Sequence, residues 1–558
     1  MKTSTVLEAV EEPQIDIELK IDIPEYFNFG YDVIDQRAAE DRNKLAMIWC
    51  NQQGDERKLT FLELSQLSNR AANFLLDIGL KQNDSVALML SRTPEWWIFS
   101  IALIKLGIVQ CSMPSLLTPY DIKARLNSGE FKMVITNPEN ADKFEEIYDE
   151  CPSFQHKLMI GGEKTDWISF EKETAKMSRS ALYKVNTPKR IKTRSDDSMM
   201  IWFTSGTSKF PKMVEHSHGY PLGHQITAQV WQRLNSNDLQ LCWTDTGWAK
   251  ISWGSYFGQW IAGACVLVCD YRNKFVAEDI LVLLEKYGVT SLCAAPTIYR
   301  MLVLCDLKKY DLSQLQKCLS AGENIHRETI QAWHEGTGKL IYEGYGQTET
   351  VCMICSTPAM PYRPGAMGKP TPGWQVELHD EDGHPVTPGE EGRIAIEVGN
   401  GKNPVGLFKG YLFNDEANAE SFINGYYYTG DKARCDAEGF FWFAGRNDDI
   451  IKSSGYRISP SEVEYVIMQH SAVHEVAAVA VPDDIRGNII KAYIVLKPNF
   501  SNSETMGKEI QSHAKTLSAP YKYPRIIQFI SQMPKTYSGK IRRNVLRQHA
   551  EDGICTWM

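Results

Sequence analysis

The chain has 558 residues, more than a single hydrophobic core usually supports, so we expect two or more domains. Its 43% apolar and 23% charged residues are ordinary for a globular protein. No apolar run approaches the roughly eighteen residues of a membrane-spanning helix. The formal net charge of −9 argues against a generally basic, nucleic-acid-binding surface.

The N-terminal segment is acidic and contains no apolar stretch. Glu8, Glu11, Glu12, Asp16 and Glu18 give it a composition unlike that of a secretory signal or an Arg-rich transit peptide. Thirteen irregularly spaced cysteines in a chain of this length indicate reduced thiols rather than a disulfide framework. We therefore expect a cytoplasmic protein.

Helix-like and strand-like pieces alternate over much of the chain. The helix-like pieces are residues 62–76, 96–106, 281–287 and 312–316, and the strand-like pieces are residues 85–90, 289–293 and 318–322. Helical periods that alternate with short apolar strands predict an α/β fold with layered, largely parallel sheets.

The pattern of predicted elements changes in the last third of the chain. From about residue 375, strands punctuated by Pro and Gly predict a smaller β-rich subdomain. Residues 447–449 are polar and unpatterned, so we expect a linker there, followed by a compact α+β unit. The predicted division is an N-terminal extension (1–25), a large N-terminal domain (26–446) and a small C-terminal domain (447–558).

Residues 201–212 (IWFTSGTSKFPK) carry the most informative pattern. An apolar run predicts a buried strand, and the turn after it is rich in Ser, Thr and Gly and ends in Lys212. Backbone N–H groups, hydroxyls and an ammonium group together suit phosphate oxygens. The spacing is not that of a GxxxxGK[ST] loop, and taken alone the segment is also compatible with an ordinary Ser/Thr-rich loop.

Four further clusters lie downstream. Residues 345–349 (YGQTE) offer a carboxylate beside hydroxyls, which suits Mg²⁺ but also the start of a helix. Residues 428–431 (YTGD) end a strand-like run with an Asp suited to ribose hydroxyls. Residues 445–458 place two arginines on either side of the linker, and residues 534–541 (PKTYSGKI) carry Lys540 on a glycine turn.

Taken in order, these motifs resemble those of the adenylate-forming (AMP-binding) superfamily. Residues 244–248 (TDTGW), 482–487 (PDDIRG) and 519–525 (APYKYPR) are similar to its medium-chain acyl-CoA synthetase branch. The resemblance runs from about residue 26 to residue 547. It implies that a carboxylic acid and ATP form an acyl-adenylate and pyrophosphate, after which coenzyme A displaces AMP.

The resemblance also implies roles for individual residues. Lys540, Thr348 and Glu349 are expected to be catalytic, and Glu349 is expected to bind Mg²⁺. Lys540 would stabilise charge that develops during adenylation. The residues expected to bind ATP or AMP are Thr204, Ser205, Gly206, Thr207, Ser208, Lys209, Lys212, Gly322, Glu323, Glu343, Gly344, Tyr345, Gly346, Gln347, Thr348, Asp431, Arg446 and Arg457.

In the family the C-terminal domain is a mobile lid that rotates between the two half-reactions, and Asp448 matches its hinge. Eight basic residues and no acidic residue lie between residues 510 and 550, and coenzyme A would account for this block without nucleic acid. The residues expected to bind coenzyme A are Arg125, Ser453, Ser454, Gly455, Arg486, Lys515, Tyr523, Pro524 and Arg525.

The acyl pocket is expected to be formed by Trp248, Lys250, Trp253 and Gly346. Acetate-restricted relatives have a tryptophan where Gly346 stands, so we expect open space at this position. The pocket is then predicted to prefer medium-length, branched or aromatic monocarboxylates over acetate. An apolar pocket grades chain lengths by only about 1–3 kcal/mol per methylene.

One residue departs from the family pattern. Lys209 stands where the family usually has glycine, which puts the geometry of the phosphate loop and the adenylation rate in question. Two other functions stay open: a ligase that loads a carrier protein from the acyl-adenylate, and an ATP-binding protein with weakened catalysis. The expected partners are the acid, ATP with Mg²⁺, and coenzyme A, with no nucleic acid and no membrane span; a homodimer stays open.

Overall fold

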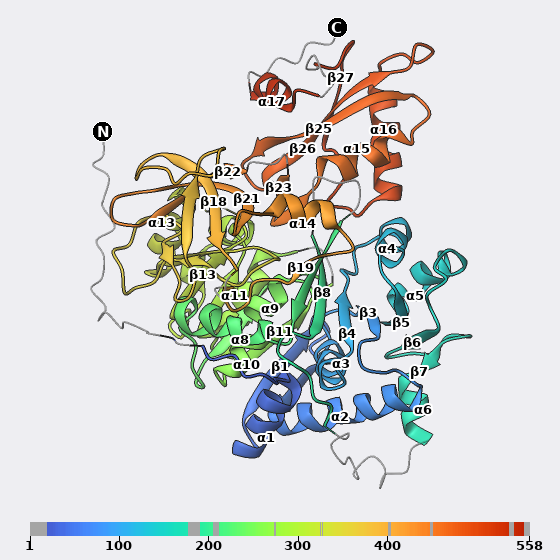
Figure 1. The fold of residues 1–558 in the computed structure, drawn as a ribbon, viewed down its shortest axis with the longest axis vertical. Coiled ribbons are helices and arrows are strands. Elements are labelled where there is room, and N and C mark those ends of the chain that lie inside the picture. Colours follow the sequence, from blue (N-terminus) through green and yellow to red (C-terminus); the bar gives the residue numbers. More distant parts are fainter. Residues whose placement is uncertain are drawn as a thin grey trace.

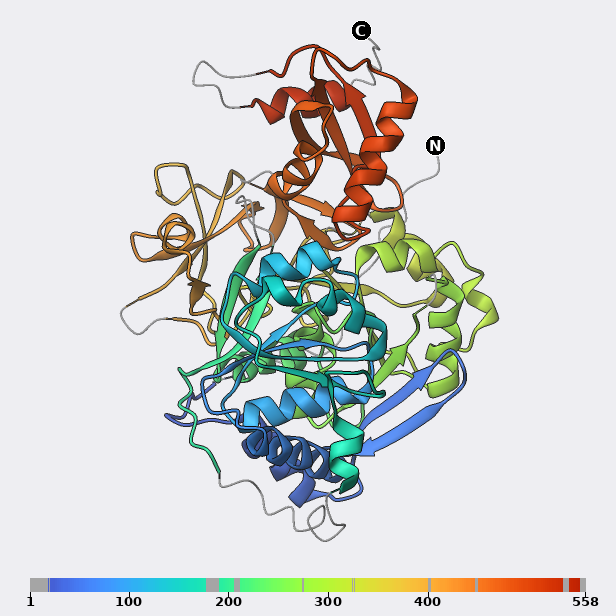
Figure 2. The same ribbon diagram turned by 90° about the vertical axis from the view of Figure 1, so that its right-hand side faces the viewer.

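A computed structural model describes the fold (Figures 1 and 2). It describes residues 19, 21–176, 190–204, 211–272, 275–323, 325, 327–399, 403–446, 450–534 and 541–551. Two α/β layers and a β-rich subdomain form a large N-terminal body, and a small C-terminal domain caps one end of it in both views. In the part of the chain so described, no helix is long and apolar enough to cross a membrane.

The first large sheet has eight strands in the order β19-β9-β8-β4-β3-β5-β6-β7. The strands are β3 (Ser85–Met89), β4 (Val109–Ser112), β5 (Phe131–Thr136), β6 (His156–Met159), β7 (Ile168–Ser169), β8 (Ser198–Thr204), β9 (Lys212–Ser217) and β19 (Gly410–Leu412). The pairs from β8 through β4, β3, β5 and β6 to β7 are parallel, whereas β9 runs antiparallel to β8 and to β19.

The helices of this layer are α2 (Phe61–Asp77), α3 (Pro94–Lys105), α4 (Pro119–Leu126), α5 (Pro138–Glu145) and α6 (Phe170–Lys176). Helix α2 begins at a capping box, in which the Thr60 side chain accepts from the Glu63 N–H and Glu63 bonds back to Thr60. Helix α3 is buried on all sides, and its Trp96 and Trp97 are fully enclosed in the main core.

The second large sheet has nine strands in the order β16-β15-β14-β13-β12-β10-β11-β1-β2. The strands are β1 (Leu45–Asn51), β2 (Glu56–Thr60), β10 (Leu239–Cys242), β11 (Cys265–Asp270), β12 (Ser291–Ala294), β13 (Lys317–Ala321), β14 (Ile341–Tyr345), β15 (Ile354–Cys355) and β16 (Lys369–Pro370). All neighbours from β1 to β14 are parallel, so the carboxyl ends of these strands lie at one edge.

The helices of this layer are α8 (Tyr220–Gln225), α9 (Lys250–Gly254), α10 (Phe257–Ile261), α11 (Ala277–Tyr287), α12 (Pro296–Leu302) and α13 (Arg327–Thr337). Shorter segments are the π-helical turns Gly30–Asp35 and Ile226–Trp231, the 3₁₀ turns Tyr148–Glu150 and Leu307–Lys309, and α1 (Gln36–Glu40). The predicted α/β class with largely parallel layers is confirmed.

The β-rich subdomain is a five-stranded antiparallel sheet with one short helix. Its elements are β17 (Val376–His379), β18 (Glu391–Glu397), α14 (Asp415–Ser421), β20 (Phe422–Ile423), β21 (Tyr426–Cys435) and β22 (Phe441–Arg446). The prediction that a strand ends at YTGD is wrong. Strand β21 continues through Asp431, which pairs with Arg446, and the positive φ of 73° at Gly430 absorbs the local distortion.

The C-terminal domain is the predicted α+β unit. It begins with the hairpin β23 (Ile451–Ser453) and β24 (Tyr456–Ile458), and its core is the sheet β25-β26-β27. The remaining elements are α15 (Pro460–Met468), β25 (Val473–Asp483), β26 (Gly487–Leu496), α16 (Glu504–Leu517), β27 (Ile526–Phe529) and α17 (Arg543–Glu551). The predicted domain boundary stays a prediction, because residues 447–449 lie outside the described residues.

One predicted helical piece is wrong. Residues 312–316 form a turn in which Asp311 accepts a hydrogen bond from the Ser313 N–H at 3.0 Å. The apolar residues Leu312 and Leu315 are buried, but the segment is too short to complete a helix once the Asp side chain bonds to the nearby backbone.

Candidate active site

A cavity of about 900 Å³ lies where the carboxyl ends of both large sheets face the C-terminal domain. The end of strand β8 and the segments that follow strands β3, β10, β11, β12, β13 and β14 all contribute to its wall. Asp431 of β21 and residues 454–457 and 485–486 of the C-terminal domain complete it. Open parallel sheets bind ligands at this edge, because loops from several strands converge there.

The phosphate-loop prediction is covered only at its two ends. Thr204, the last residue of β8, lines the cavity, and its buried hydroxyl has no hydrogen-bond partner among the described residues. Lys212 begins β9, and its ammonium nitrogen lies 4.6 Å from the centroid of the Tyr411 ring. Ser205, Gly206, Thr207, Ser208 and Lys209 lie outside the described residues, as do Lys540 and Asp448.

Glu349 is held by a phenol and a guanidinium. Its side chain is 1% exposed; one carboxylate oxygen accepts from the Tyr411 hydroxyl at 2.9 Å, and the other lies 3.3 Å from Arg457 of β24. Burial and the nearby Glu349 charge raise the pKa of Tyr411 well above its usual range, so this phenol stays a donor. The pair Glu349–Arg457 joins the YGQTE motif to the C-terminal domain. This motif forms a turn rather than a helix start.

The backbone of Thr348 is fixed by a buried histidine. Thr348 lines the cavity, and its carbonyl oxygen accepts from Nε2 of His216 at 2.7 Å. Burial lowers the pKa of His216 to about 3, so the imidazole is neutral and carries its proton on the nitrogen that donates. The ring stacks on Tyr220 at 3.7 Å between centroids.

Asp431 lies in a buried hydrogen-bond network at the cavity wall. Its Oδ2 accepts from the Tyr345 hydroxyl and from Nε2 of Gln347, each at 2.7 Å. Gln347 also donates to the Thr429 carbonyl at 2.9 Å and accepts from the Tyr427 hydroxyl at 3.1 Å. These contacts orient the carboxylate before any ligand binds. The backbone of Arg446 pairs with Asp431, and its side chain lies outside the description.

The structure brings only part of the next group of predicted nucleotide-binding residues to the cavity. Gly322, Gly346 and Gln347 line it, whereas Glu323, Glu343, Gly344 and Tyr345 do not. Burial raises the pKa of Glu343 to about 8, against the opposing effect of hydrogen bonds from the Ile325 and Gly365 N–H groups. Gly344 packs on Trp231, because a Cβ there would lie 2.5 Å from the indole.

Glu323 forms a contact between domains instead. One of its oxygens lies 3.0 Å from Arg300, and the other accepts a hydrogen bond from the Gly455 N–H. Arg300 in turn donates to the Ile485 carbonyl at 3.0 Å. Glu323 and Arg300 therefore seat the loop that carries Gly455 against the N-terminal domain.

All four predicted acyl-pocket residues line the cavity. The expectation of open space at Gly346 needs correction: a Cβ there would lie 2.4 Å from the Val351 carbonyl oxygen and 2.5 Å from the Trp253 indole. Trp253 fills the space that the residue type suggested was open. Trp248 packs edge to face on Tyr456 and Tyr521 of the C-terminal domain, with centroids 5.3 and 5.6 Å away.

Only some of the predicted coenzyme A residues line the cavity. Ser454, Gly455 and Arg486 line the cavity, whereas Ser453 is buried in β23. Lys515 and Arg525 lie on the Tyr523 ring, each 4.6 Å from its centroid, and do not line the cavity. Pro524, between Tyr523 and Arg525, is buried.

Arg125 is buried in the N-terminal domain. Its guanidinium donates to the Asp121 carbonyl at 2.9 Å and lies over the Phe203 ring. It also lies 3.7 Å from the Asp121 carboxylate. In this arrangement it does not line the cavity, so its predicted contact with coenzyme A has no support here.

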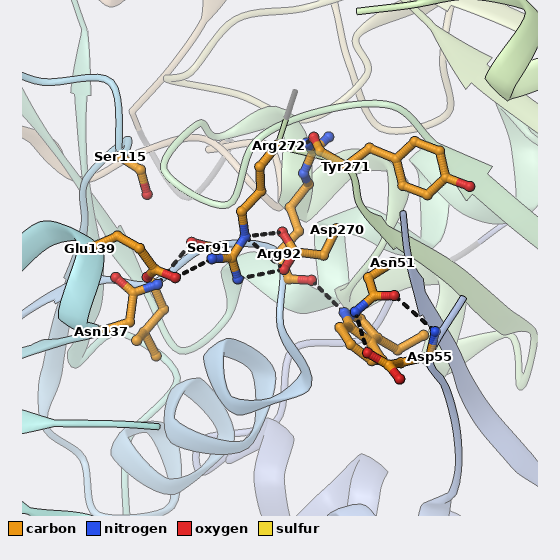
Figure 3. Close-up of polar contacts among 12 residues, drawn as sticks. Asn51, Asp55, Ser91, Arg92, Ser115, Asn137, Glu139, Asp270, Tyr271 and Arg272 are labelled. Atoms are coloured by element: carbon orange, nitrogen blue, oxygen red, sulfur yellow. Dashed lines mark hydrogen bonds and ion pairs between the residues drawn. The ribbon is translucent and has the colours of Figure 1, made fainter. Parts of the chain in front are cut away.

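Sequence reasoning missed a polar cluster that lines the cavity (Figure 3). Arg272 lies 2.6 Å from Asp270 and also pairs with Glu139, while Arg92 donates to the Tyr271 carbonyl. These residues lie at or just after the carboxyl ends of β3, β5 and β11, so the ends of predicted parallel strands were the signal that could have located them.

A buried ion network links the two domains away from the cavity. Lys522 lies 2.8 Å from Asp121 of α4 and 2.8 Å from Glu462 of α15, and all three side chains are at most 7% exposed. The Ala519 N–H donates to Asp121 at 2.8 Å. Burial alone would raise the pKa of Asp121, but the charges of Lys522 and Arg125 outweigh it and lower the pKa.

Comparisons with known proteins give the family of the chain. The family model "AMP-binding enzyme" matches residues 34–412, and "AMP-binding enzyme C-terminal domain" matches residues 462–540. The mitochondrial acyl-coenzyme A synthetase ACSM3 of Mus musculus is 41% identical over 95% of this chain and 92% of its own. The mitochondrial ACSM5 of Homo sapiens is 42% identical over 94% and 91%.

Solved structures share the whole architecture. The anthranilate CoA ligase AuaEII in complex with anthranoyl-AMP is 30% identical, with a TM-score of 0.70 over 95% of this chain and 99% of its own. An acyl-CoA synthetase of Brucella canis is 30% identical, with a TM-score of 0.68 over 94% and 95%. The chain belongs to the family of AMP-binding, adenylate-forming enzymes.

Proposed function

We propose that the protein is an ATP-dependent acyl-CoA synthetase that acts on medium-length, branched or aromatic carboxylic acids. The acid would first attack the α-phosphate of ATP, giving an acyl-adenylate and pyrophosphate. The thiol of coenzyme A would then attack the acyl carbon and release AMP. The acyl-coenzyme A synthetases among its relatives support this activity, and the anthranilate CoA ligase among the similar structures supports an aromatic acid as one of the substrates.

The adenylation step joins two anions, so the site must neutralise charge and align the reacting groups. Thr204 and Lys212 would hold phosphate oxygens, together with the loop between them, and Asp431 would accept from the ribose hydroxyls. Lys540 would approach the α-phosphate in this step. The Glu349 carboxylate is a suitable donor for Mg²⁺, which would offset phosphate charge, but Arg457 must first withdraw because it now pairs with that carboxylate.

The second step needs a route for the thiol. In this structure Ser454, Gly455 and Tyr456 of the C-terminal domain line the cavity, and the Gly455 N–H is bonded to Glu323. This is the arrangement that thioester formation would use. We propose that the domain rotates about Asp448 to exchange this loop for Lys540.

One observation carries the proposal. Residues spread over more than two hundred positions of the sequence, Thr204, Thr348, Asp431 and Arg486 among them, line a single cavity at the carboxyl ends of two parallel sheets. A protein that only senses ATP would not need a cavity lined by both the nucleotide motifs and the predicted coenzyme A residues.

The test is a pyrophosphate-release assay over C2–C10, branched and aromatic acids, with and without coenzyme A. We expect release with medium-length or aromatic acids and formation of the CoA thioester. Thioester that forms only on a carrier protein would instead establish the carrier-loading alternative, and no release with any acid would establish the catalytically weakened one. The assay in EDTA, followed by added MgCl₂, tests the metal requirement.

The site of action in the cell is a separate proposal. We propose a cytoplasmic enzyme because the N-terminal segment is acidic, yet the relatives named above are mitochondrial proteins. Fractionation of cells that express the full chain decides between these compartments.

A further inference from the structure

The acyl side of the cavity contains a lysine that the proposed reaction does not use. Lys250 is the first residue of α9, and Trp253 lies one turn further on the same face of this helix. Both residues line the cavity with Ala321, Gly322 and Gly346. Lys250 is only half-buried, so its ammonium group lies at the wall rather than within the core.

The ammonium group of Lys250 is anchored by a neutral partner. Nζ donates to the carbonyl oxygen of Ala321, at the end of β13, at 2.9 Å. It also lies 4.0 Å from the position that a Cβ would take at Gly322, so the missing side chain there leaves the group accessible. Among the described residues it forms no ion pair with a carboxylate, whereas Lys143, another of the lysines that line the cavity, donates to both Ser115 and Asn140.

The other neighbours of Lys250 are apolar side chains and buried cysteine thiols. Ala249, Trp253 and Ala321 are buried neighbours on the same wall. An ammonium group has three N–H donors, of which the Ala321 carbonyl accepts one. A plain hydrocarbon chain would displace water from the remaining donors without replacing those hydrogen bonds, which disfavours it.

We propose that Lys250 selects acids whose acyl group carries a second oxygen that accepts a hydrogen bond. This inference rests on the proposed function and narrows its substrate class. The oxygen belongs either to a neutral substituent, such as a hydroxyl or oxo group, or to a second carboxylate. The Trp253 indole packs against the carbon skeleton, and Lys250 binds the oxygen beside it.

The test compares matched acids that differ only in this oxygen. The pairs are hexanoate with 5-oxohexanoate and with hexanedioate, and benzoate with 3- and 4-hydroxybenzoate and with benzene-1,4-dicarboxylate. The measured quantity is the ratio of kcat/KM for CoA thioester formation within each pair. A charge-assisted hydrogen bond predicts a ratio of roughly 10- to 100-fold in favour of at least one oxygen-bearing acid. If the oxo or hydroxy acids have the higher ratio, the oxygen belongs to a neutral substituent. If the dicarboxylates have the higher ratio, it belongs to a second carboxylate.

Substitution of the lysine tests the cause. In Lys250→Met the ratio is expected to fall to about one, because methionine has a similar length and no donor, and Lys250→Arg is expected to restore part of it. Lys143→Met is the matched control, since it removes a lysine from the same cavity and should leave the ratio as in the wild type. Equilibrium binding of the same pairs to each variant gives a readout that does not require turnover.

Two results would overturn the inference. One is a wild-type enzyme that prefers the unsubstituted acid in every pair. The other is a ratio that Lys250→Met leaves unchanged even though activity falls, which would mean that Lys250 serves the reacting carboxylate or the nucleotide. Absence of thioester from every acid would count against the proposed function instead, and the binding ratios would still test the role of Lys250.

Discussion

Glu343 is a carboxyl group that the fold keeps protonated. Burial raises its pKa to about 8, although the Ile325 and Gly365 N–H groups oppose this change. In the unfolded chain the pKa of a glutamate is about 4.3, so between about pH 4.3 and 8 the folded state binds more protons than the unfolded state. The free energy of unfolding should therefore decrease as the pH rises through this window.

Glu343→Gln should remove this pH dependence. Glutamine matches the shape of the protonated acid: its amide oxygen still accepts from backbone N–H groups, and its NH2 group donates where the acid has its O–H. We expect the variant to be more stable than the wild type at pH 8.5, by on the order of a few kcal/mol, and close to it at pH 5. Thermal unfolding of both proteins at the two pH values measures the difference. An equal shift at both values would mean that the carboxyl group is ionised throughout.

Glu349 is paired with Arg457 in this arrangement, yet we propose that it serves Mg²⁺ during adenylation. Glu349→Gln keeps the Tyr411 contact and removes the charge. We expect ATP–pyrophosphate exchange to fall by roughly 100- to 1,000-fold, the usual loss when one stabilising group for developing charge is removed. Tyr411→Phe is the control, because it removes a partner of Glu349 without changing its charge. A normal exchange rate in Glu349→Gln would refute the metal role.

At the scale of residues, the sequence predicted which residues line the cavity better than it predicted what surrounds each of them. Thr348, Asp431 and Arg486 could be located because fixed motifs carry them. The filling of the space beside Gly346 by Trp253 could not be predicted, because it depends on how α9 packs on β14. The burial of Glu323 and Glu343 could not be predicted for the same reason. The sequence alone shows neither which residues a carboxylate will contact nor how deeply it will be buried.

At the scale of elements, the loop between β10 and α9 of the second large sheet packs against the first large sheet. Gly247 of this loop lies so close to the segment after β4 that a Cβ would be 2.0 Å from the Pro114 nitrogen. The next residue, Trp248, lines the cavity and contacts Tyr456 and Tyr521. The position of the cavity wall thus depends on a close approach between backbones that only glycine permits.

Gly247→Ala should separate these two segments. We expect destabilisation of about 1–3 kcal/mol or more and a raised KM for the acid, because Trp248 moves with the loop. The matched control is Gly507→Ala in α16, where the nearest atom to the new Cβ lies 4.0 Å away. This change should stabilise the helix by about 0.5–1 kcal/mol. Unfolding midpoints and acid KM values of both variants test the pair, and a lower stability of Gly507→Ala than of Gly247→Ala would contradict the argument.

Most elements could be predicted because their periodicity is strong. The helix-like run 62–76 is α2, and the strand-like run 85–90 is β3, each within a residue or so at its ends. The prediction was wrong at residues 312–316, where a side chain of Asp311 turns the backbone, and at YTGD, where β21 continues past a glycine. Both errors concern local backbone geometry, which hydrophobic patterning does not encode.

For the whole molecule, the question is what holds the C-terminal domain in the present arrangement. The Asp121 network consists of Asp121, Lys522, Glu462 and Arg125. Lys522 and Glu462 belong to the C-terminal domain, so their pair at 2.8 Å survives any rotation of that domain. The contacts of Asp121 with Lys522 and with the Ala519 N–H cross between domains, so the proposed rotation would break them. Asp121 is therefore the member that stabilises one arrangement over another.

Asp121→Asn should weaken this arrangement and leave each domain folded. In the C-terminal domain Lys522 keeps Glu462 as its partner, and in the N-terminal domain an asparagine can still cap α4 while Arg125 keeps its hydrogen bond to the main-chain carbonyl of residue 121. If the arrangement serves thioester formation, the variant loses roughly 10- to 100-fold in single-turnover transfer from acyl-adenylate to coenzyme A, as expected for a charge-assisted contact. ATP–pyrophosphate exchange should fall much less, because the contact does not exist in the rotated state.

The control is Asp238→Asn, which breaks the buried pair with Lys317 at 2.6 Å inside the second sheet. It should lower stability without changing the ratio of the two half-reactions. An equal loss in both half-reactions for Asp121→Asn would mean that the network supports the fold and has no part in the domain movement.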